Sequence, residues 1–242
     1  MTEPGYYDFL EFNSPLSSAR ADSIARSLVR RAPETVVDLG CGWGELLLSI
    51  VAAGPGSRGI GVDSDERLIA RASNNARVRG LSDRVEFRVG DLVDASDPAD
   101  VVVCIGADHA FGSQAEALRQ LRPRVGPGGR LLFGSGFWER PPTEEQAATI
   151  GMTPASLTGL EGLVEMSVAS GFRPLGIQTA NRDEWDAFES GFLADWEEWL
   201  VDNADDPEAD AIRTSSNAHR DGWLRGYRDV LGFAYLTLAQ AG

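Results

Sequence analysis

The chain has 242 residues, of which 43% are hydrophobic and 24% are charged. These fractions match ordinary globular proteins and exclude a disordered or fibrous chain, and the length predicts a single large domain. The 22 basic residues are all arginines and are outnumbered by 37 acidic ones, which gives a net charge of −15. Because so negative a surface repels phosphate groups, we expect no nucleic-acid partner and no binding to an anionic membrane.

Cysteine content and the N-terminal sequence predict the compartment. The chain has two cysteines, Cys41 and Cys104, each inside an apolar run, so no disulfide framework is expected. The first residues contain no basic region followed by an apolar stretch, and no apolar run approaches the roughly 20 residues of a membrane span. We therefore expect a cytoplasmic protein without a signal peptide or membrane segment.

The first elements in chain order alternate between two patterns. A helical spacing of apolar residues begins at Leu16 and ends before Pro33. Short apolar runs then alternate with helical patterns, which predicts a parallel sheet with helices on both faces. The continuous apolar run VVVCI is typical of a strand buried on both sides. We expect strands at 35–39, 58–62, 85–89, 100–105 and 130–133, and helices at 45–53, 65–79 and 114–124.

The pattern changes after Phe133. We expect a loop with a short helix over 139–154, a helix over 160–170, a strand over 173–179 and a last strand over 231–239. The stretch 181–210 holds 12 acids and one base. Its aromatic residues recur every three or four positions, which predicts one amphipathic helix with its aromatic face packed inward and its acids in water.

A glycine-rich turn is the most informative motif. The predicted strand that ends at Leu39 leads into Gly40, Gly42 and Gly44 and then into a helix. Glycine permits a positive φ and lets a ligand lie against bare backbone. Asp38 lies at the end of this strand, where a carboxylate would repel a pyrophosphate and attract a cation.

Two more motifs follow neighbouring strands. Asp63 ends the second strand, where a carboxylate can bind ribose hydroxyls, and Asp91 and Leu92 follow the third strand, in a position to meet an adenine ring. A nucleotide-binding or NAD-dependent domain is one interpretation of these features.

The motifs DLGCGWG, GVDSDE, GDLVD and ADVVVCIG and the turn at 126–129 resemble class I S-adenosylmethionine-dependent methyltransferases, in a bacterial branch of that family. The resemblance covers about 33–180. It implies an α/β, Rossmann-like, seven-stranded and mostly parallel sheet, in which the strand from Arg173 is at the edge and the last strand is antiparallel beside it. One domain would comprise an N-terminal helix and lid (1–32), a cofactor-binding core (33–180), a helical cover insertion (181–228) and the final strand (229–242).

The resemblance also implies S-adenosyl-L-methionine as cofactor, S-adenosyl-L-homocysteine as product and a role for each motif. The methionine part would be held by Asp38, Gly40, Cys41 and Gly42. The ribose would be held at Asp63 and Ser64, the adenine by Asp91 and Leu92, and the ammonium end by the backbone around Ile105 and Gly106. The cofactor carries a sulfonium and an ammonium and no phosphate, so acids and carbonyls suit it.

Methyl transfer is an in-line displacement, so the enzyme chiefly aligns the nucleophile and excludes water. His109 follows the fourth strand, at the sheet edge where ligands bind in open α/β folds, and the unperturbed pKa of histidine suits a base. It could instead position the acceptor or cap the next helix. Asp108 is a candidate partner for His109 or for an acceptor amine. His219 lies in a polar stretch and is expected at the surface.

Aromatic and acidic residues form a second candidate group. Tyr6 and Tyr7 are expected in a lid, and Trp138 and Glu139 follow the fifth strand, where they could contact the acceptor. Core packing is the alternative for most of the tryptophans. An aromatic and acidic pocket would favour an amine through cation–π contact, and a flat aromatic hydroxyl compound is the other possibility.

The sequence thus predicts methyl transfer to an oxygen or nitrogen of a small molecule by a monomer or homodimer. We expect no metal, since no spaced set of ligands is present. Two alternatives remain: a protein-modifying methyltransferase whose acidic cover recruits a basic partner, and a non-catalytic protein that binds the cofactor.

Overall fold

The computed structural model describes residues 6–93 and 98–241, which form two compact units. The sheet unit comprises Ser17–Gly136, Glu161–Thr179 and Phe233 onward. The helical unit comprises the chain up to Leu16, Phe137–Leu160 and Ala180–Gly232. Each unit is described by itself.

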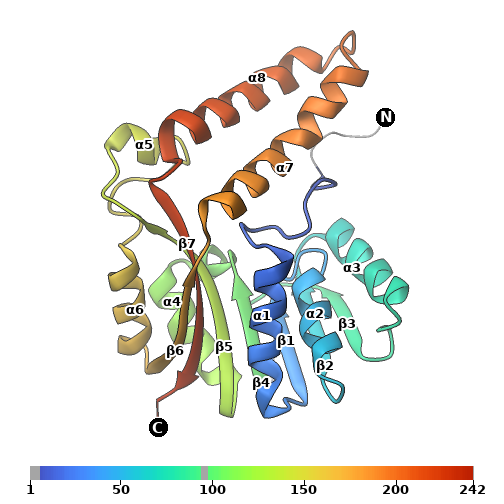
Figure 1. The fold of residues 1–242 in the computed structure, drawn as a ribbon, viewed down its shortest axis with the longest axis vertical. Helices are drawn as coiled ribbons and strands as arrows, with labels where there is room; N and C mark the ends of the chain where they lie inside the picture. The colour runs from blue at the N-terminus through green and yellow to red at the C-terminus, as the bar shows by residue number, and fades with distance from the viewer. Residues whose placement is uncertain (1–5, 94–97, 242) are drawn as a thin grey trace. The chain divides into compact units, whose positions relative to one another are not determined.

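The strands form one sheet of order β3-β2-β1-β4-β5-β7-β6 (Figure 1). Strands β1 to β5 pair in parallel, whereas β6 and β7 pair antiparallel. The expected edge strand, β6, and the antiparallel last strand beside it are therefore confirmed. The strands are β1 (Thr35–Leu39), β2 (Arg58–Asp63), β3 (Val85–Val89), β4 (Ala99–Ile105), β5 (Val125–Trp138), β6 (Phe172–Thr179) and β7 (Leu231–Gln240).

Helices flank this sheet, and polar side chains cap several of them. In Figure 1, α1 and α2 lie in front of the central strands and α4 lies behind them. Ser17, Asp65 and Ser113 accept backbone hydrogen bonds in the first turns of α1, α3 and α4, which satisfies amides that have no partner within the helix. The helices and 3-10 turns are α1 (Ser18–Leu28), η1 (Val29–Arg31), α2 (Glu45–Ala53), α3 (Glu66–Val78), η2 (Asp108–Phe111), α4 (Gln114–Leu121), η3 (Arg122–Arg124) and α6 (Leu160–Ala169).

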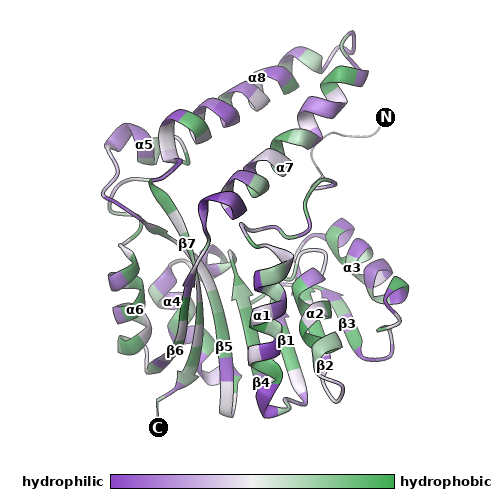
Figure 2. Ribbon diagram, in the orientation of Figure 1, coloured by the Kyte–Doolittle hydropathy of each residue, from purple (hydrophilic) through white to green (hydrophobic). Residues whose placement is uncertain are grey.

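The core of the sheet unit is built on the central strands. Leu39, Val103 and Phe133, on three neighbouring strands, are fully buried. Residues 101–105 of β4 are all hydrophobic, and the visible upper part of β4 is green in Figure 2, as a sheet covered on both faces requires. The packed core gives the loops at the strand ends a rigid base.

The helical unit contains α5 (Glu144–Ala148), α7 (Arg182–Asp202), α8 (Ala209–Asp221) and a turn of π-helix, η4 (Gly222–Tyr227). One buried cluster centres on Trp138, Ala147 and Val230. A second joins Leu193 of α7 to Trp223 and Tyr227 of η4. No helix in the described part of the chain is both long enough and apolar enough to cross a membrane.

The acidic helix differs from its prediction. The stretch 181–210 is α7 followed by a loop and the start of α8, not one helix. The expectation that its acids face water is wrong for Glu184, Glu189 and Asp195, which are buried. Each of these carboxylates has a partner within the helical unit. Glu184 accepts a hydrogen bond from the Asn181 amide at the start of α7, and Asp195 accepts one from the Asp8 amide. Glu189 accepts a hydrogen bond from Tyr227 Oη (2.8 Å) and lies 2.7 Å from His219 Nε2. His219, expected at the surface, is half-buried against the Phe192 ring, with centroids 4.7 Å apart.

Candidate active site

The carboxyl ends of four parallel strands bring the predicted cofactor residues to one edge of the sheet. The order β3-β2-β1-β4 is continuous and every pair in it is parallel. The loops after these strands therefore lie side by side, and they carry Asp91, Asp63, Gly40 and Gly106 in that order along the edge. Open α/β sheets bind ligands at such an edge.

The glycine-rich turn after β1 needs its glycines. Gly40, Gly42 and Gly44 have φ of 82°, 53° and 78°, in the left-handed region that side chains disfavour. A Cβ on Gly40 would lie 2.6 Å from Cβ of Ala107, so only glycine fits between this turn and the loop after β4. A Cβ on Gly42, by contrast, would meet no heavy atom within 4 Å. The backbone of Gly42 is thus open on its side-chain side.

Asp63 holds the turn in place. Its Oδ2 accepts a hydrogen bond from the Gly42 amide at 2.9 Å, and its Oδ1 accepts one from the Asp65 amide at 3.0 Å. The amides of Gly40 and Cys41 donate to the Val62 carbonyl at 2.8 and 3.1 Å. A carboxylate has about four acceptor positions, so Asp63 keeps capacity for hydroxyl donors. Ser64, next in the chain, is exposed.

The centre of this edge is electrostatically negative. Asp38 is 4% exposed, and its burial, together with the charge of Asp63, raises the pKa of its carboxyl from 3.8 to about 7. Burial and the charges of the same two carboxylates raise the pKa of the Cys41 thiol, which therefore stays protonated. A cation at this position would favour the ionised form of the Asp38 carboxyl.

The loops after β3 and β4 complete the edge. Leu92 is buried, and Arg124 fixes its backbone by donating to the Leu92 carbonyl at 2.6 Å. Asp91 is exposed and accepts a hydrogen bond from the Val93 amide at 2.9 Å. Ile105 ends β4, and Gly106 follows with φ of 68° and open space where a side chain would be. The role of Arg124 was not predicted, because a single arginine in a helical pattern carries no such signal.

These features fit a cation-bearing cofactor better than a phosphate-bearing one. The backbone is open at Gly42 and Gly106, which are the positions that a side chain would fill. Asp38 and Asp63 supply negative charge beside the open turn. A pyrophosphate at this position would be repelled by both carboxylates, whereas an ammonium or sulfonium would be attracted.

Asp108, which precedes His109 in the loop after β4, belongs to a hydrogen-bonded network. Burial raises the pKa of Asp108, although a hydrogen bond from Ser135 opposes the rise. Ser135 Oγ in turn accepts a hydrogen bond from Gln114 Nε2 at 2.7 Å. His109 is exposed, and the structure gives its ring no hydrogen bond or ion pair within the described residues. The network anchors the loop and leaves the imidazole open to a ligand.

Ser135 and Gln114 were missed by the sequence analysis. Ser135 follows the predicted fifth strand and Gln114 begins a predicted helix, and no pattern in the sequence links the two positions. Both are buried polar side chains, and their pairing depends on the alignment of β5 with α4, which no local pattern encodes.

The remaining predicted residues belong to the helical unit. Tyr6 and Tyr7 are half-buried with ring centroids 6.0 Å apart, and Tyr7 lies 5.9 Å from Phe192 of α7. The Asp8 amide donates to Asp195 Oδ1 at 3.0 Å, which ties this N-terminal segment to α7. Asp195 was not predicted as an anchor.

Trp138 and Glu139 are adjacent in the chain but differ in their surroundings. Trp138 is 6% exposed, packs in the cluster with Ala147 and Val230, and donates from Nε1 to the Pro154 carbonyl at 3.0 Å. These contacts favour the core-packing alternative for its ring. Glu139 is exposed and lines a pocket of the helical unit.

Comparisons with known proteins agree with this geometry. The family model "Methyltransferase domain" matches residues 31–161. The uncharacterized protein YjhP of Escherichia coli is 29% identical over an alignment of 230 residues that covers 93% of this chain and 92% of that protein. A structure of a Geobacter sulfurreducens S-adenosylmethionine-dependent methyltransferase in complex with S-adenosyl-L-homocysteine superposes with a TM-score of 0.88 and 26% identity, covering 98% of this chain and 96% of that one.

A second relative is similar over part of its length. The 23S rRNA (uracil(1939)-C(5))-methyltransferase RlmD of Acidithiobacillus ferrooxidans is 32% identical over an alignment of 141 residues that covers 51% of this chain and 32% of that protein. The matched family model, the seven-stranded sheet and the cofactor-product complex of the similar structure lead to one conclusion: the chain belongs to the class I S-adenosylmethionine-dependent methyltransferases and uses S-adenosylmethionine as its methyl donor.

Proposed function

We propose that this methyltransferase acts on an oxygen or nitrogen of a small molecule, with His109 as the base or as the group that positions the acceptor. The observation that carries the proposal is the exposed imidazole of His109 on a loop anchored through Asp108 and Ser135, at the carboxyl edge of the sheet. An open side chain on a fixed loop suits contact with an incoming acceptor.

The cofactor residues have separate proposed roles. Asp38 and the turn at Gly40, Cys41 and Gly42 bind the methionine part, with the carboxylate of Asp38 attracting positive charge. Asp63 and Ser64 bind the ribose, Asp91 and Leu92 bind the adenine, and the backbone at Ile105 and Gly106 binds the ammonium end. The open backbone at Gly42 and Gly106 supports this assignment.

The main task of the protein in methyl transfer is to align the acceptor with the methyl group. S-adenosylmethionine supplies a methyl group on a sulfonium, which the acceptor's lone pair displaces in line. His109 accepts the proton that an oxygen or nitrogen acceptor loses, or donates a hydrogen bond that orients the acceptor. The network from Asp108 to Gln114 keeps the loop rigid while this happens.

Charge supports a small molecule over nucleic acid or protein. The net charge of −15 repels RNA. A basic protein would need exposed, unengaged acids, yet several carboxylates of α7 are occupied within the helical unit: Asp186 by Arg228, Glu189 by Tyr227 and Asp195 by the Asp8 amide. The acidic helix is thus partly a structural feature of its own unit.

Methyl-labelled S-adenosylmethionine tests the proposal. The protein is incubated with the label and an extract of the source cells, the products are separated by size, and a reaction without the protein is subtracted as control. We expect label in small molecules, whose mass then identifies the acceptor. Label in RNA or protein would contradict the proposal. Cofactor binding without transfer would favour the non-catalytic alternative.

A further inference from the structure

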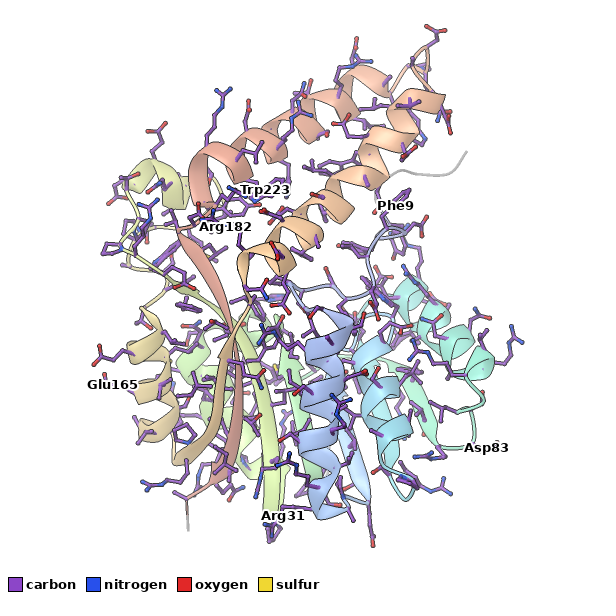
Figure 3. All side chains as sticks on the ribbon, viewed as in Figure 1. Phe9, Arg31, Asp83, Glu165, Arg182 and Trp223 are labelled. Atoms are coloured by element: carbon purple, nitrogen blue, oxygen red, sulfur yellow. The ribbon has the colours of Figure 1, made fainter. Side chains whose placement is uncertain are left out.

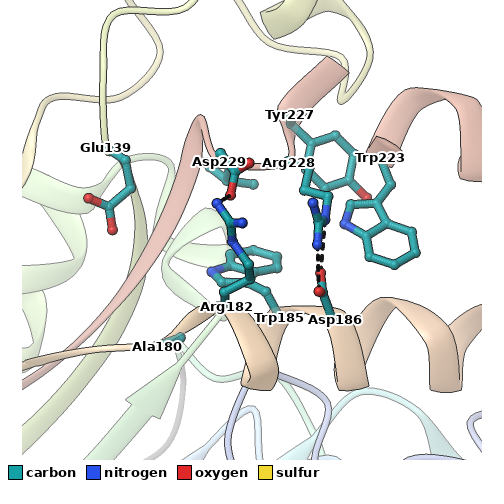
Figure 4. A pocket seen from close by; sticks show the side chains of 10 residues that line it. Glu139, Ala180, Arg182, Trp185, Asp186, Trp223, Tyr227, Arg228 and Asp229 are labelled. Atoms are coloured by element: carbon teal, nitrogen blue, oxygen red, sulfur yellow. Dashed lines mark hydrogen bonds and ion pairs between the residues drawn. The ribbon is translucent and has the colours of Figure 1, made fainter. Parts of the chain in front are cut away.

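A pocket of about 230 Å³ lies within the helical unit (Figure 4). Its walls come from the end of β5, the start of α7, the η4 turn and the start of β7. It is lined by three aromatic side chains, three carboxylates, two guanidinium groups and two aliphatic residues: Trp185, Trp223, Tyr227, Glu139, Asp186, Asp229, Arg182, Arg228, Ala180 and Leu231. The volume is below the usual range for drug-sized ligands and fits one or two fused rings.

Both guanidinium groups of the lining are neutralised by lining carboxylates. Arg228 binds Asp186 through two bonds, Nε to Oδ1 at 3.0 Å and Nη2 to Oδ2 at 2.6 Å. Arg182 Nη2 donates to Asp229 Oδ1 at 2.5 Å. Dashed lines in Figure 4 mark both ion pairs. The five charged lining residues therefore leave one unbalanced charge, that of Glu139.

Glu139 has no side-chain partner in the part of the chain that the structure describes. Its backbone is fixed, since its amide donates to the Val230 carbonyl at 2.9 Å, and its side chain is exposed at the pocket. A carboxylate that lines the same pocket as three aromatic rings attracts a cation, and both its charge and the ring quadrupoles contribute. The lining thus selects for positive charge in a ligand.

Trp185 adds a hydrogen-bond donor. Its Nε1 is buried and has no acceptor among the described residues. A buried donor without a partner costs about 1–3 kcal/mol, so an incoming acceptor gains from pairing with it. Arg182 lies three residues earlier on α7, and its side chain is 61% exposed in its ion pair with Asp229, so this part of the pocket lining can rearrange when a ligand enters.

We propose that this pocket binds a small fused-ring aromatic cation that carries one hydrogen-bond acceptor. The ring of the ligand packs against Trp185, Trp223 and Tyr227. Its cationic group faces Glu139, and its acceptor accepts a hydrogen bond from the indole N–H of Trp185. This inference concerns binding within the helical unit and stands apart from the proposed methyl transfer.

Three probes and three variants of the full chain test it by calorimetry. The probe 6-(aminomethyl)quinoline has both the cation and the ring nitrogen, 2-(aminomethyl)naphthalene lacks the nitrogen, and 6-(hydroxymethyl)quinoline lacks the charge. We expect saturable binding of the first probe, and affinities about tenfold weaker for each of the other two, as the loss of one such interaction gives.

The variants assign each effect to a side chain. Glu139→Gln should weaken both amines about tenfold and leave the hydroxymethyl compound unchanged. Trp185→Phe should weaken the binding of both quinolines and leave that of the naphthalene unchanged. Unchanged binding of the naphthalene also shows that the pocket is still folded. Glu144→Gln, which removes an exposed acid outside the pocket, should change nothing. No saturable binding of any probe, or equal affinities in Glu139→Gln and the unmodified protein, would overturn the proposal.

Discussion

The carboxylate of Asp63, at the end of β2, accepts a hydrogen bond from the amide of Gly42 in the turn after β1. One side chain thus fixes the turn of the neighbouring strand and at the same edge faces the proposed ribose position. Hydrogen bonds to charged groups contribute roughly 1.5–3 kcal/mol each. The turn and the cofactor residue are therefore coupled through this contact.

Asp63→Asn should weaken both the support of the glycine turn and the binding of the cofactor. The amide oxygen can replace only part of the acceptor capacity, and we expect S-adenosylhomocysteine to bind at least about tenfold more weakly. Calorimetric titration measures the affinity, and a urea unfolding curve measures the smaller loss of stability. The matched control is Asp83→Asn, at an exposed acid before β3 where the strands begin (Figure 3). Unchanged affinity in Asp63→Asn would contradict the proposed role.

Gly40→Ala should strongly reduce stability and cofactor binding for steric reasons. The new Cβ would lie 2.6 Å from Ala107 Cβ, at a φ of 82° that alanine disfavours. We expect a loss of stability on the order of 2–4 kcal/mol, measured by urea unfolding, and a loss of cofactor binding. Gly56→Ala, where a Cβ would meet nothing within 4 Å, is the control and should be neutral. A stable Gly40→Ala variant with normal binding would refute the argument.

Local patterns predicted most of the sheet. The bounds of β1, β3 and α2 agree with their predictions, because each apolar run is bounded by turn residues that end it. β5 is longer than its predicted 130–133, since Gly126–Gly129 continue the strand where glycine and proline indicated a turn. There, Val125 pairs with Ala99 and Arg130 pairs with Val101, so residues 126–129 bulge out of the pairing with β4, which is how the strand accommodates the glycines and the proline.

The candidate site was predicted less completely than the fold. Motifs identified Asp38, the glycine turn and Asp63, because their chemistry follows strand ends directly. Buried partners such as Ser135 and Glu189 could not be found, since each pairs with a residue more than 20 positions away. Charge patterning assumed that acids stay in water, and it failed at Glu189 because α8 and η4 supplied donors.

Asp38 predicts a dependence of stability on pH. The pKa of its carboxyl is about 7 in the folded protein, against 3.8 without burial, so the folded state keeps a proton that the unfolded state releases. The free energy of unfolding should therefore fall as pH rises from about 4 to about 7, by roughly 1 kcal/mol per unit, and level off above that. The test is to measure the free energy of unfolding against pH for the unmodified protein and for Asp38→Asn. The contribution of Asp38 to the slope should be present in the first and absent in the second.

The same group predicts a dependence of binding on pH. S-adenosylhomocysteine lacks the sulfonium but keeps the ammonium, which favours ionised Asp38, so its affinity should rise up to about pH 7 and then become constant. Titrations at several pH values in buffers of different ionisation enthalpy should also detect release of a proton on binding below pH 7. A flat profile in the unmodified protein would show that Asp38 does not respond to the cofactor.

The cluster of Glu189, Tyr227 and His219 should stabilise the helical unit. Tyr227→Phe removes a buried hydroxyl that donates to Glu189, and we expect a cost of about 1–3 kcal/mol. Urea unfolding followed by tryptophan fluorescence suits this test, because five of the six tryptophans lie in that unit. The double variant with His219→Ala should be non-additive, since both residues share one carboxylate. Additive costs would indicate independent contacts.

His109 is the residue on which the mechanism depends most. His109→Ala should lower kcat by about 100-fold or more if the imidazole is a base, while the affinity for S-adenosylhomocysteine stays nearly unchanged, because the proposed cofactor contacts lie elsewhere. His109→Gln separates the two roles: it keeps a hydrogen-bonding group but cannot accept a proton near neutral pH. A base predicts that both variants are slow and lose the acid limb of the pH–rate profile. A positioning group predicts that Gln retains most of kcat and that Ala raises KM. Full turnover in His109→Ala would remove the residue from the chemistry.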